Sequence, residues 1–341
     1  MSDHAEQPES PGKEGMMAGA RHFATRAYFH LKPYIPRNVS RAVRRLALPG
    51  LLRRSKATWP IDESAACKPE GWQGWPDGKQ FAFVLTHDVE SNRGVDGVRK
   101  LVALEEARGF RSSFNFIPEG PYETPASLRE WLEEKQFEVG VHDLYHDGHL
   151  YESREGFSRK AESINRYLKE WNASGFRSGF MLRRLEWLHE LDIVYDTSTF
   201  DTDPFEPEPD GSHTIFPYHV APPAGVAGDG YVELSYTLPQ DSTLFVLMRK
   251  KSVDVWKRKL DWVAENGGLA LVNIHPDYID FSGEGIGSCC YPVEYIEDLL
   301  DYVMGEYKGM FWNPLARDLA VWFRDQSLET NSPRSGDRRV S

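Results

Sequence analysis

Short hydrophobic runs alternate with longer amphipathic stretches through most of this chain. The hydrophobic runs are short enough for buried strands, and the stretches between them have the spacing of helices with one apolar face. The predicted strands are 81–86, 111–117, 137–141, 175–177, 193–195, 231–237, 243–248 and 269–274. The predicted helices are 94–108, 125–135, 154–171, 182–190, 253–265, 293–304 and 314–324. Strands that alternate with helices in this way predict an α/β fold with a parallel sheet, either open or closed into a barrel.

The two ends of the chain differ in composition from the region between them. Residues 1–20 are rich in Gly, Ser, Pro and Glu, and residues 327–341 are polar, so we expect disordered tails at both ends. Residues 59–326 form the body, which we expect to be a single main domain. Within it, the proline-rich segment 201–230 is too long for a simple connection, and we expect it to form a rim or lid loop.

A basic amphipathic arm, residues 21–58, precedes the body. From Arg21 to Lys56 it holds ten Lys or Arg residues and no Asp or Glu, with apolar residues between them. Such an arm could lie on an anionic membrane surface. Alternatively, it wraps the protein's own acidic body or mediates contacts in a homo-oligomer. We expect Pro33, Pro36 and Pro49 to break any long helix in it.

Charge and cysteine content exclude several classes of protein. The formal net charge of −12 argues against nucleic acid as the main partner, because binding phosphates requires a basic face. The three cysteines, Cys67, Cys289 and Cys290, form no disulfide framework, which is typical of a reduced intracellular protein. No apolar run has the length of a membrane span, and the N-terminus lacks the hydrophobic core of a signal peptide, so we expect a cytoplasmic protein.

Polar side chains of catalytic type follow the ends of four separate predicted strands. They are Asp88 and Glu90, His142 and His146, Arg177, and His275. The carboxyl ends of parallel strands are where active sites lie in barrels and in doubly wound sheets alike. The convergence of four strand ends therefore predicts one functional site.

The two histidines have a spacing that suits a shared metal ion. If the chain coils into a helical turn after His142, the Cβ atoms of His142 and His146 come to lie roughly 5–6 Å apart. Asp88 and Glu90 are two residues apart in extended chain, so their carboxylates can point to one side. Alternatively, the histidines cap a turn and face solvent, the acidic pair faces solvent, and His275 is structural.

The combination of these groups predicts a hydrolase. Two histidines with one carboxylate and an open position are typical of catalytic zinc, whose bound water has its pKa lowered to about 7. One of Asp88 and Glu90 could bind the metal while the other accepts a proton. His275 is suited to be the general acid for a leaving nitrogen.

Five motifs occur along the chain in the order and spacing of a known family. They are Thr86–Glu90 (THDVE), His142-x-x-x-His146, Phe176–Phe180 (FRSGF), Tyr195–Ser198 (YDTS) and Ile274–Pro276 (IHP). Over residues 81–275 they resemble the polysaccharide deacetylases, which are carbohydrate esterase family 4 (CE4) and the nodulation-protein-B homology superfamily. The resemblance implies a distorted (β/α) barrel of about seven parallel strands. It also implies hydrolysis of acetamido groups on sugars with a divalent metal, for which we expect zinc.

The same resemblance implies a role for each motif residue. These are Asp88 as catalytic base, Arg177 as the arginine that orients it, His275 as catalytic acid, His142 and His146 as metal ligands, and the backbone N–H of Phe180 near the oxyanion hole. Many members have a second aspartate where this chain has Val89, and a subset has Asp-x-Asp, which gives Glu90 the role of third metal ligand.

Two further positions depart from the family pattern, and one motif has no clear match. Gly179 stands where proline is common, and Asp143 replaces a small residue. The family also has an aspartate that tunes the catalytic histidine, and Asp201 and Asp203 are the candidates for it here.

The sequence therefore predicts a hydrolase that removes an acyl group, in particular acetyl, from an N-acylated sugar or glycan of surface-polysaccharide metabolism. We expect it in the cytoplasm, where the basic arm could hold it at the inner face of the membrane. The alternatives are an amide hydrolase acting on a small non-sugar molecule and a carbohydrate-binding protein whose catalytic site has decayed.

Overall fold

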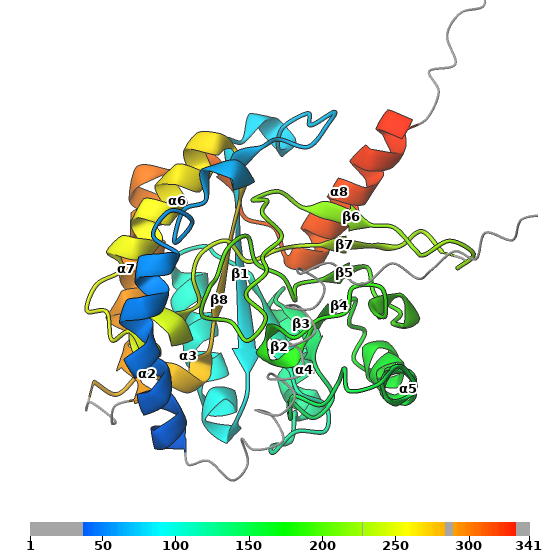
Figure 1. The fold of residues 1–341 in the computed structure, drawn as a ribbon, viewed down its shortest axis with the longest axis horizontal. Helices are drawn as coiled ribbons and strands as arrows, with labels where there is room; N and C mark the ends of the chain where they lie inside the picture. Colours follow the sequence, from blue (N-terminus) through cyan, green and yellow to red (C-terminus); the bar gives the residue numbers. More distant parts are fainter. Residues whose placement is uncertain (1–36, 227, 284–288, 332–341) are drawn as a thin grey trace, which may run out of the picture.

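The computed structural model describes residues 37–226, 228–283 and 289–331, and the chain folds around one curled, mostly parallel sheet (Figure 1). In order across the sheet, β8, β1, β2, β3, β4, β5 and β7 run parallel to their neighbours, and β6 pairs antiparallel with β7. The strands are β1 (Phe81–Val89), β2 (Ser112–Phe116), β3 (Glu138–His142), β4 (Gly175–Arg177), β5 (Tyr195–Asp196), β6 (Tyr218–Val220), β7 (Tyr231–Glu233) and β8 (Leu269–Ile274). Shorter strands are β9 (Ile279–Asp280), which pairs with β10 (Tyr291–Pro292), and β11 (Phe311–Trp312), which lies beside the start of β1.

The two ends of this sheet approach each other beyond β7. The backbone N–H groups of Thr237 and Leu238 donate to the carbonyl oxygen of Leu271 in β8, at 3.0 and 3.1 Å. This bridge closes the curl, so the sheet is the distorted (β/α) barrel that the sequence predicts, in a single domain.

Helices pack against both faces of the curled sheet. They are α2 (Arg37–Arg54), α3 (Asn92–Ala107), α4 (Ala126–Glu134), α5 (Arg154–Glu170), α6 (Asp254–Asn266), α7 (Glu294–Glu306) and α8 (Ala316–Asn331). In Figure 1, α2, α6 and α7 lie on one side of the molecule and α5 on the other. Helix α8 extends past residue 326, where we expected the body to end, and residues 332–341 of the predicted tail lie outside the described residues. None of the helices in the described ranges is long and apolar enough to cross a membrane.

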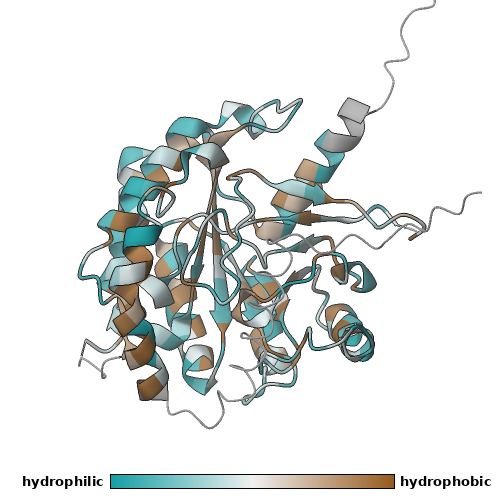
Figure 2. Cartoon of the chain, viewed as in Figure 1, coloured by the Kyte–Doolittle hydropathy of each residue, from teal (hydrophilic) through white to brown (hydrophobic). Residues whose placement is uncertain are grey.

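Strand β1 is the centre of the core, and every residue in it is buried. Its apolar half packs against aromatic side chains, with the Phe83 ring 5.7 Å from Phe110 and 6.2 Å from Phe311. Each such side chain contributes roughly 1.5–3 kcal/mol when it is removed from water. Figure 2 shows β1 changing from hydrophobic to hydrophilic toward its carboxyl end. That end is therefore held rigidly while carrying polar groups.

Two predicted elements were wrong. Residues Ser242–Leu247, where we expected a strand, form a π-helical turn, because a short apolar run fits a buried helix as well as a buried strand. Of the helix predicted over 182–190, only the 3₁₀ turn Leu188–Glu190 is present among regular elements.

The basic arm is described only from residue 37 onward, and that part is helix α2. The helix continues through Pro49, so our expectation that this proline would break it was wrong. A proline removes one helical hydrogen bond, but Leu48 and Leu51 pack against the core on either side of it and stabilise the helix. Arg45 also donates to the carbonyl oxygens of Val246 and Leu247, at 2.9 and 3.2 Å. The inner face of α2 is thus attached to the body.

Candidate active site

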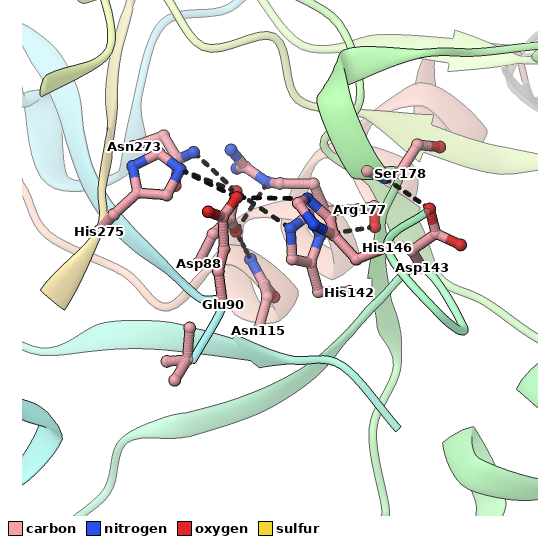
Figure 3. Close-up of polar contacts among 12 residues, drawn as sticks. Asp88, Glu90, Asn115, His142, Asp143, His146, Arg177, Ser178, Asn273 and His275 are labelled. Atoms are coloured by element: carbon pink, nitrogen blue, oxygen red, sulfur yellow. Dashed lines mark hydrogen bonds and ion pairs between the residues drawn. The ribbon is translucent and has the colours of Figure 1, made fainter. Parts of the chain in front are cut away.

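Asp88 lies near the carboxyl end of β1 and is fixed from both neighbouring strands (Figure 3). Asn115 in β2 donates to its Oδ1 at 3.0 Å, and Asn273 in β8 donates to its Oδ2 at 2.7 Å. The register explains this arrangement, because Asp88 pairs with Asn115 and Thr86 pairs with Asn273. The carboxylate is 2% exposed and has one orientation.

Arg177, at the end of β4, lies against the same carboxylate. Its Nε atom is 3.5 Å from Asp88 Oδ1, and the guanidinium also donates to Thr197 at 3.0 Å and to Thr86 at 2.9 Å. Burial on its own raises the pKa of Asp88, but the charge of Arg177 and further polar neighbours outweigh it and lower the pKa to about 2. Asp88 is therefore ionised and able to accept a proton.

Glu90, His142 and His146 form a cluster beside Asp88. Their potential ligand atoms all lie within 4.8 Å of one another, and Glu90 Oε1 is 3.2 Å from His146 Nε2. We expected the two histidines to meet on a helical turn, and this was wrong. His142 ends β3, and the chain then turns through Asp143 and His146, both with positive φ (57° and 55°), which brings the two rings to 4.7 Å between centroids.

The chemistry of this donor set fits a divalent metal ion. His142 is 2% exposed, its Nδ1 lies 3.1 Å from the carbonyl oxygen of Arg177, and its buried Nε2 has no hydrogen-bond partner within the described part of the chain. Burial lowers the pKa of His142, so the ring is neutral and its Nε2 lone pair is available. Burial opposes ionisation of Glu90, but His146 and other neighbours lower its pKa well below the ordinary range. Two imidazoles and a carboxylate are ligands that zinc and similar ions prefer.

His275 follows β8 and faces Asp88 and Glu90 from the side opposite His142 and His146 (Figure 3). Its Nε2 is 4.0 Å from Asp88 Oδ2 and 3.8 Å from Glu90 Oε1. Its Nδ1 is 2.7 Å from Oδ1 of Asp241, a fully buried carboxylate that also accepts from the His275 backbone N–H at 2.8 Å. Burial alone lowers the pKa of His275, but the charge of Asp241 outweighs it and the pKa rises to about 10. His275 is therefore protonated at neutral pH and can donate a proton.

Asp201 and Asp203, our candidates for the aspartate that tunes His275, do not contact it. Asp201 pairs with the buried ammonium of Lys259, and Asp203 accepts from the Tyr236 hydroxyl at 2.9 Å. The carboxylate that contacts His275 is instead Asp241, at the start of the π-helical turn that we predicted to be a strand. Both candidates lie in the segment that follows β5, whereas the chain next to β8 is the stretch after β7.

The two unusual residues of the sequence, Asp143 and Gly179, are in direct contact. Asp143 Oδ2 accepts from the Gly179 backbone N–H at 3.2 Å, and a Cβ atom at Gly179 would lie 2.5 Å from the same oxygen. A proline at 179 would have no N–H to donate and would also collide with the carboxylate. The two departures therefore depend on each other.

Sequence reasoning missed three residues that shape this site. They are Asn115, Asn273 and Asp241. The two asparagines lie in predicted strands, and only the register between strands shows that they reach Asp88. No sequence signal marked Asp241, because its surroundings read as the start of a strand. The Phe180 backbone N–H remains a prediction for the oxyanion hole, while the Phe180 ring lies 4.2 Å from that of His146.

Comparison with solved structures finds similar folds, whereas the two sequence comparisons find no match. No family model matches the chain, and no curated protein matches it in sequence. A solved structure of a candidate polysaccharide deacetylase from Mycobacterium smegmatis is similar, with a TM-score of 0.57 and 16% identity over 80% of this chain and 99% of that one. Weaker similarities include a CE4 family pseudoenzyme from Bacillus anthracis (TM-score 0.43, 12% identity, 72% of this chain and 66% of that one). Another is a Bordetella bronchiseptica protein described as a candidate deacetylase involved in O-antigen biosynthesis (0.41, 16%, 76% and 94%).

Proposed function

We propose that this chain, which has the fold of the CE4 polysaccharide deacetylases, is a metal-dependent hydrolase that removes an acetyl group from an N-acylated sugar. One observation carries the proposal. An ionised carboxylate, Asp88, and a protonated imidazole, His275, lie 4.0 Å apart, and both border the Glu90, His142 and His146 cluster. A base and an acid next to a potential metal site are what hydrolysis of an amide requires.

In this proposal the metal ion, the base and the acid have separate tasks in the reaction. A divalent ion held by Glu90, His142 and His146, for which we favour zinc, would supply Lewis-acid polarisation of the acyl group and an acidified water. Asp88 takes a proton from the water whose oxygen bonds to the acyl carbon. His275 Nε2 gives a proton to the amide nitrogen as the carbon–nitrogen bond breaks, so the products are acetate and an amino sugar.

Two residues keep the base and the acid in opposite protonation states. Arg177 stabilises the ionised form of Asp88, and Asp241 stabilises the charged form of His275. The separation of their pKa values is what assigns the base and acid roles. Asn115 and Asn273 orient the base by donating to its two oxygens.

Acetate release from N-acetylated sugars and glycans, with small acyl amides as a comparison set, tests the proposal. Asp88→Asn and His275→Gln should each lower turnover by about 10²–10⁴-fold while retaining the metal. Asp261→Asn is the matched control, because Asp261 accepts hydrogen bonds from Tyr302 and Tyr307 and belongs to helix α6. Turnover of the amides alone would favour a non-sugar substrate. No turnover by the metal-loaded protein would favour a glycan-binding protein.

We also propose that α2 holds the enzyme on an anionic membrane, at its cytoplasmic face. Val39, Val43 and Leu46 follow one another at helical spacing on its outer face, with exposed fractions of 51%, 60% and 83%. Exposed Arg53 and Arg54 follow at the carboxyl end of the helix. An apolar face with basic residues beside it is complementary to an anionic lipid surface, to which each Lys or Arg contributes about 1 kcal/mol.

Sedimentation with phosphatidylglycerol vesicles tests this attachment. The double variant Val43→Asp/Leu46→Asp should lose most of the binding, while the control Met310→Asp/Val321→Asp removes two other exposed apolar side chains (43% and 37% exposed) and should bind as before. Equal binding by all three proteins would refute the proposal. A change from dimer to monomer in the α2 variant, without vesicle binding in the wild type, would instead assign this face to a homo-oligomer.

A further inference from the structure

Glu90, the third residue of the proposed metal cluster, is held by a tyrosine that no motif includes. The hydroxyl of Tyr278 donates to Glu90 Oε2 at 3.1 Å, while the other oxygen of the carboxylate, Oε1, faces His146 Nε2 at 3.2 Å. The Tyr278 ring also lies 5.2 Å from the His275 ring. One carboxylate oxygen is thus occupied by the tyrosine, and the other is directed into the cluster.

The backbone around Glu90 is fixed by the residue before this tyrosine. Asp277 Oδ2 accepts from the Glu90 backbone N–H at 3.0 Å, and Asp277 Oδ1 accepts from the Ser91 hydroxyl. Asp277 also packs closely against Gly94, where an added Cβ atom would lie 2.3 Å from Asp277 Oδ2. The short 3₁₀ turn Pro276–Tyr278 therefore holds both the backbone and the side chain of Glu90.

We infer that Tyr278 is a positioning residue that orients the Glu90 carboxylate toward the metal ion. A glutamate has one more rotatable bond than an aspartate, so its carboxylate can occupy more positions unless a second contact selects one. The Tyr278 hydrogen bond provides that contact and leaves Oε1 as the ligand atom. Partners of this kind, one contact away from the ion, typically change metal affinity by 10–100-fold when they are removed. The inference rests on the proposed metal site and adds a residue that the site requires.

Tyr278→Phe removes only the hydroxyl and tests the inference through metal binding. We would titrate Zn²⁺ against a chromophoric chelator and record the visible spectrum of bound Co²⁺, which depends on the ligands and their geometry. Tyr278→Phe should bind Zn²⁺ 10–100-fold more weakly and should change the Co²⁺ spectrum. The matched control is Tyr302→Phe, which loses a hydroxyl that donates to Asp261 at 2.8 Å on the surface of α6 and α7. It should match the wild type in both measurements.

The outcomes separate this inference from the proposed function. Wild-type affinity and spectrum in Tyr278→Phe would overturn the inference alone and leave the metal site standing. An equal loss of affinity in Tyr278→Phe and Tyr302→Phe would also overturn it, since the effect would then be general. A wild-type protein that binds neither ion would overturn the proposed function and the inference with it. Thermal unfolding of each variant without metal establishes that both are folded.

Discussion

Replacing Asp241 by asparagine tests the pairing that makes His275 an acid. Asp241 is fully buried and accepts four hydrogen bonds, two from His275, one from the Ser242 backbone at 2.7 Å and one from the Tyr291 hydroxyl at 2.8 Å. Asparagine has no charge, and its amide group cannot accept from the donors that face the second carboxylate oxygen. The variant therefore breaks a buried ion pair and leaves donors unsatisfied.

The size and pH dependence of the effect follow from the structure. Breaking a buried ion pair by removing one partner costs about 3–5 kcal/mol of the free energy of unfolding. The pKa of His275 in the folded protein is raised to about 10, above the ordinary value of about 6.5. Its contribution to stability is therefore complete below about pH 6.5 and is lost as the pH rises through about 10. The difference between wild type and variant should shrink over the same range.

Urea unfolding at pH 6 and pH 10, with a chelator present so that no metal contributes, measures this difference. Asp261→Asn is the control, because it removes a carboxylate that accepts from two tyrosines but pairs with no histidine. We expect Asp241→Asn to be about 3 kcal/mol less stable than the wild type at pH 6 and closer to it at pH 10. A difference that stays constant with pH, or that is equal in both variants, would refute the pairing as the source of the His275 charge.

Two further predictions concern the departures from the family pattern and the buried acid Asp203. Gly179→Ala places a Cβ atom 2.5 Å from Asp143 Oδ2 and should lower the free energy of unfolding by about 1–3 kcal/mol. Adding Asp143→Ala should restore part of it, and no recovery in urea unfolding would contradict the steric account. Burial, together with the charge of Glu206, raises the pKa of Asp203 to about 8. The unfolded chain loses this proton from about pH 4 while the folded protein keeps it, so the free energy of unfolding falls as the pH rises from about 4 to about 8. Asp203→Asn should flatten the stability profile over that range, and a profile parallel to that of the wild type would show that another group is responsible.

The polar strand ends and the barrel could be predicted from the sequence because each depends on local pattern. Asp88 follows a hydrophobic run, His142 ends another, and Arg177 and His275 end two more, so their strands bring them to one edge of the sheet. The pairing of β8 with β1 then places His275 beside Asp88. The order of the strands and their parallel direction were therefore sufficient to predict which residues meet at the site.

The contacts between these residues could not be predicted, because they depend on register and on backbone conformations that sequence does not reveal. Asn115 reaches Asp88 only because of the β1–β2 register. His146 turns toward Glu90 through a left-handed turn in which His146 itself has φ of 55°. Asp241 starts a π-helical turn in an apolar run that fits a strand equally well.

Metal content of the purified protein, by elemental analysis, tests the central claim most directly. The claim is that Glu90, His142 and His146 hold one divalent ion beside Asp88 and His275. We predict about one zinc or similar ion per chain in the wild type and its loss in both Glu90→Ala and His146→Ala after identical handling. A wild-type protein without metal after reconstitution at neutral pH, or variants that keep the ion, would contradict the claim.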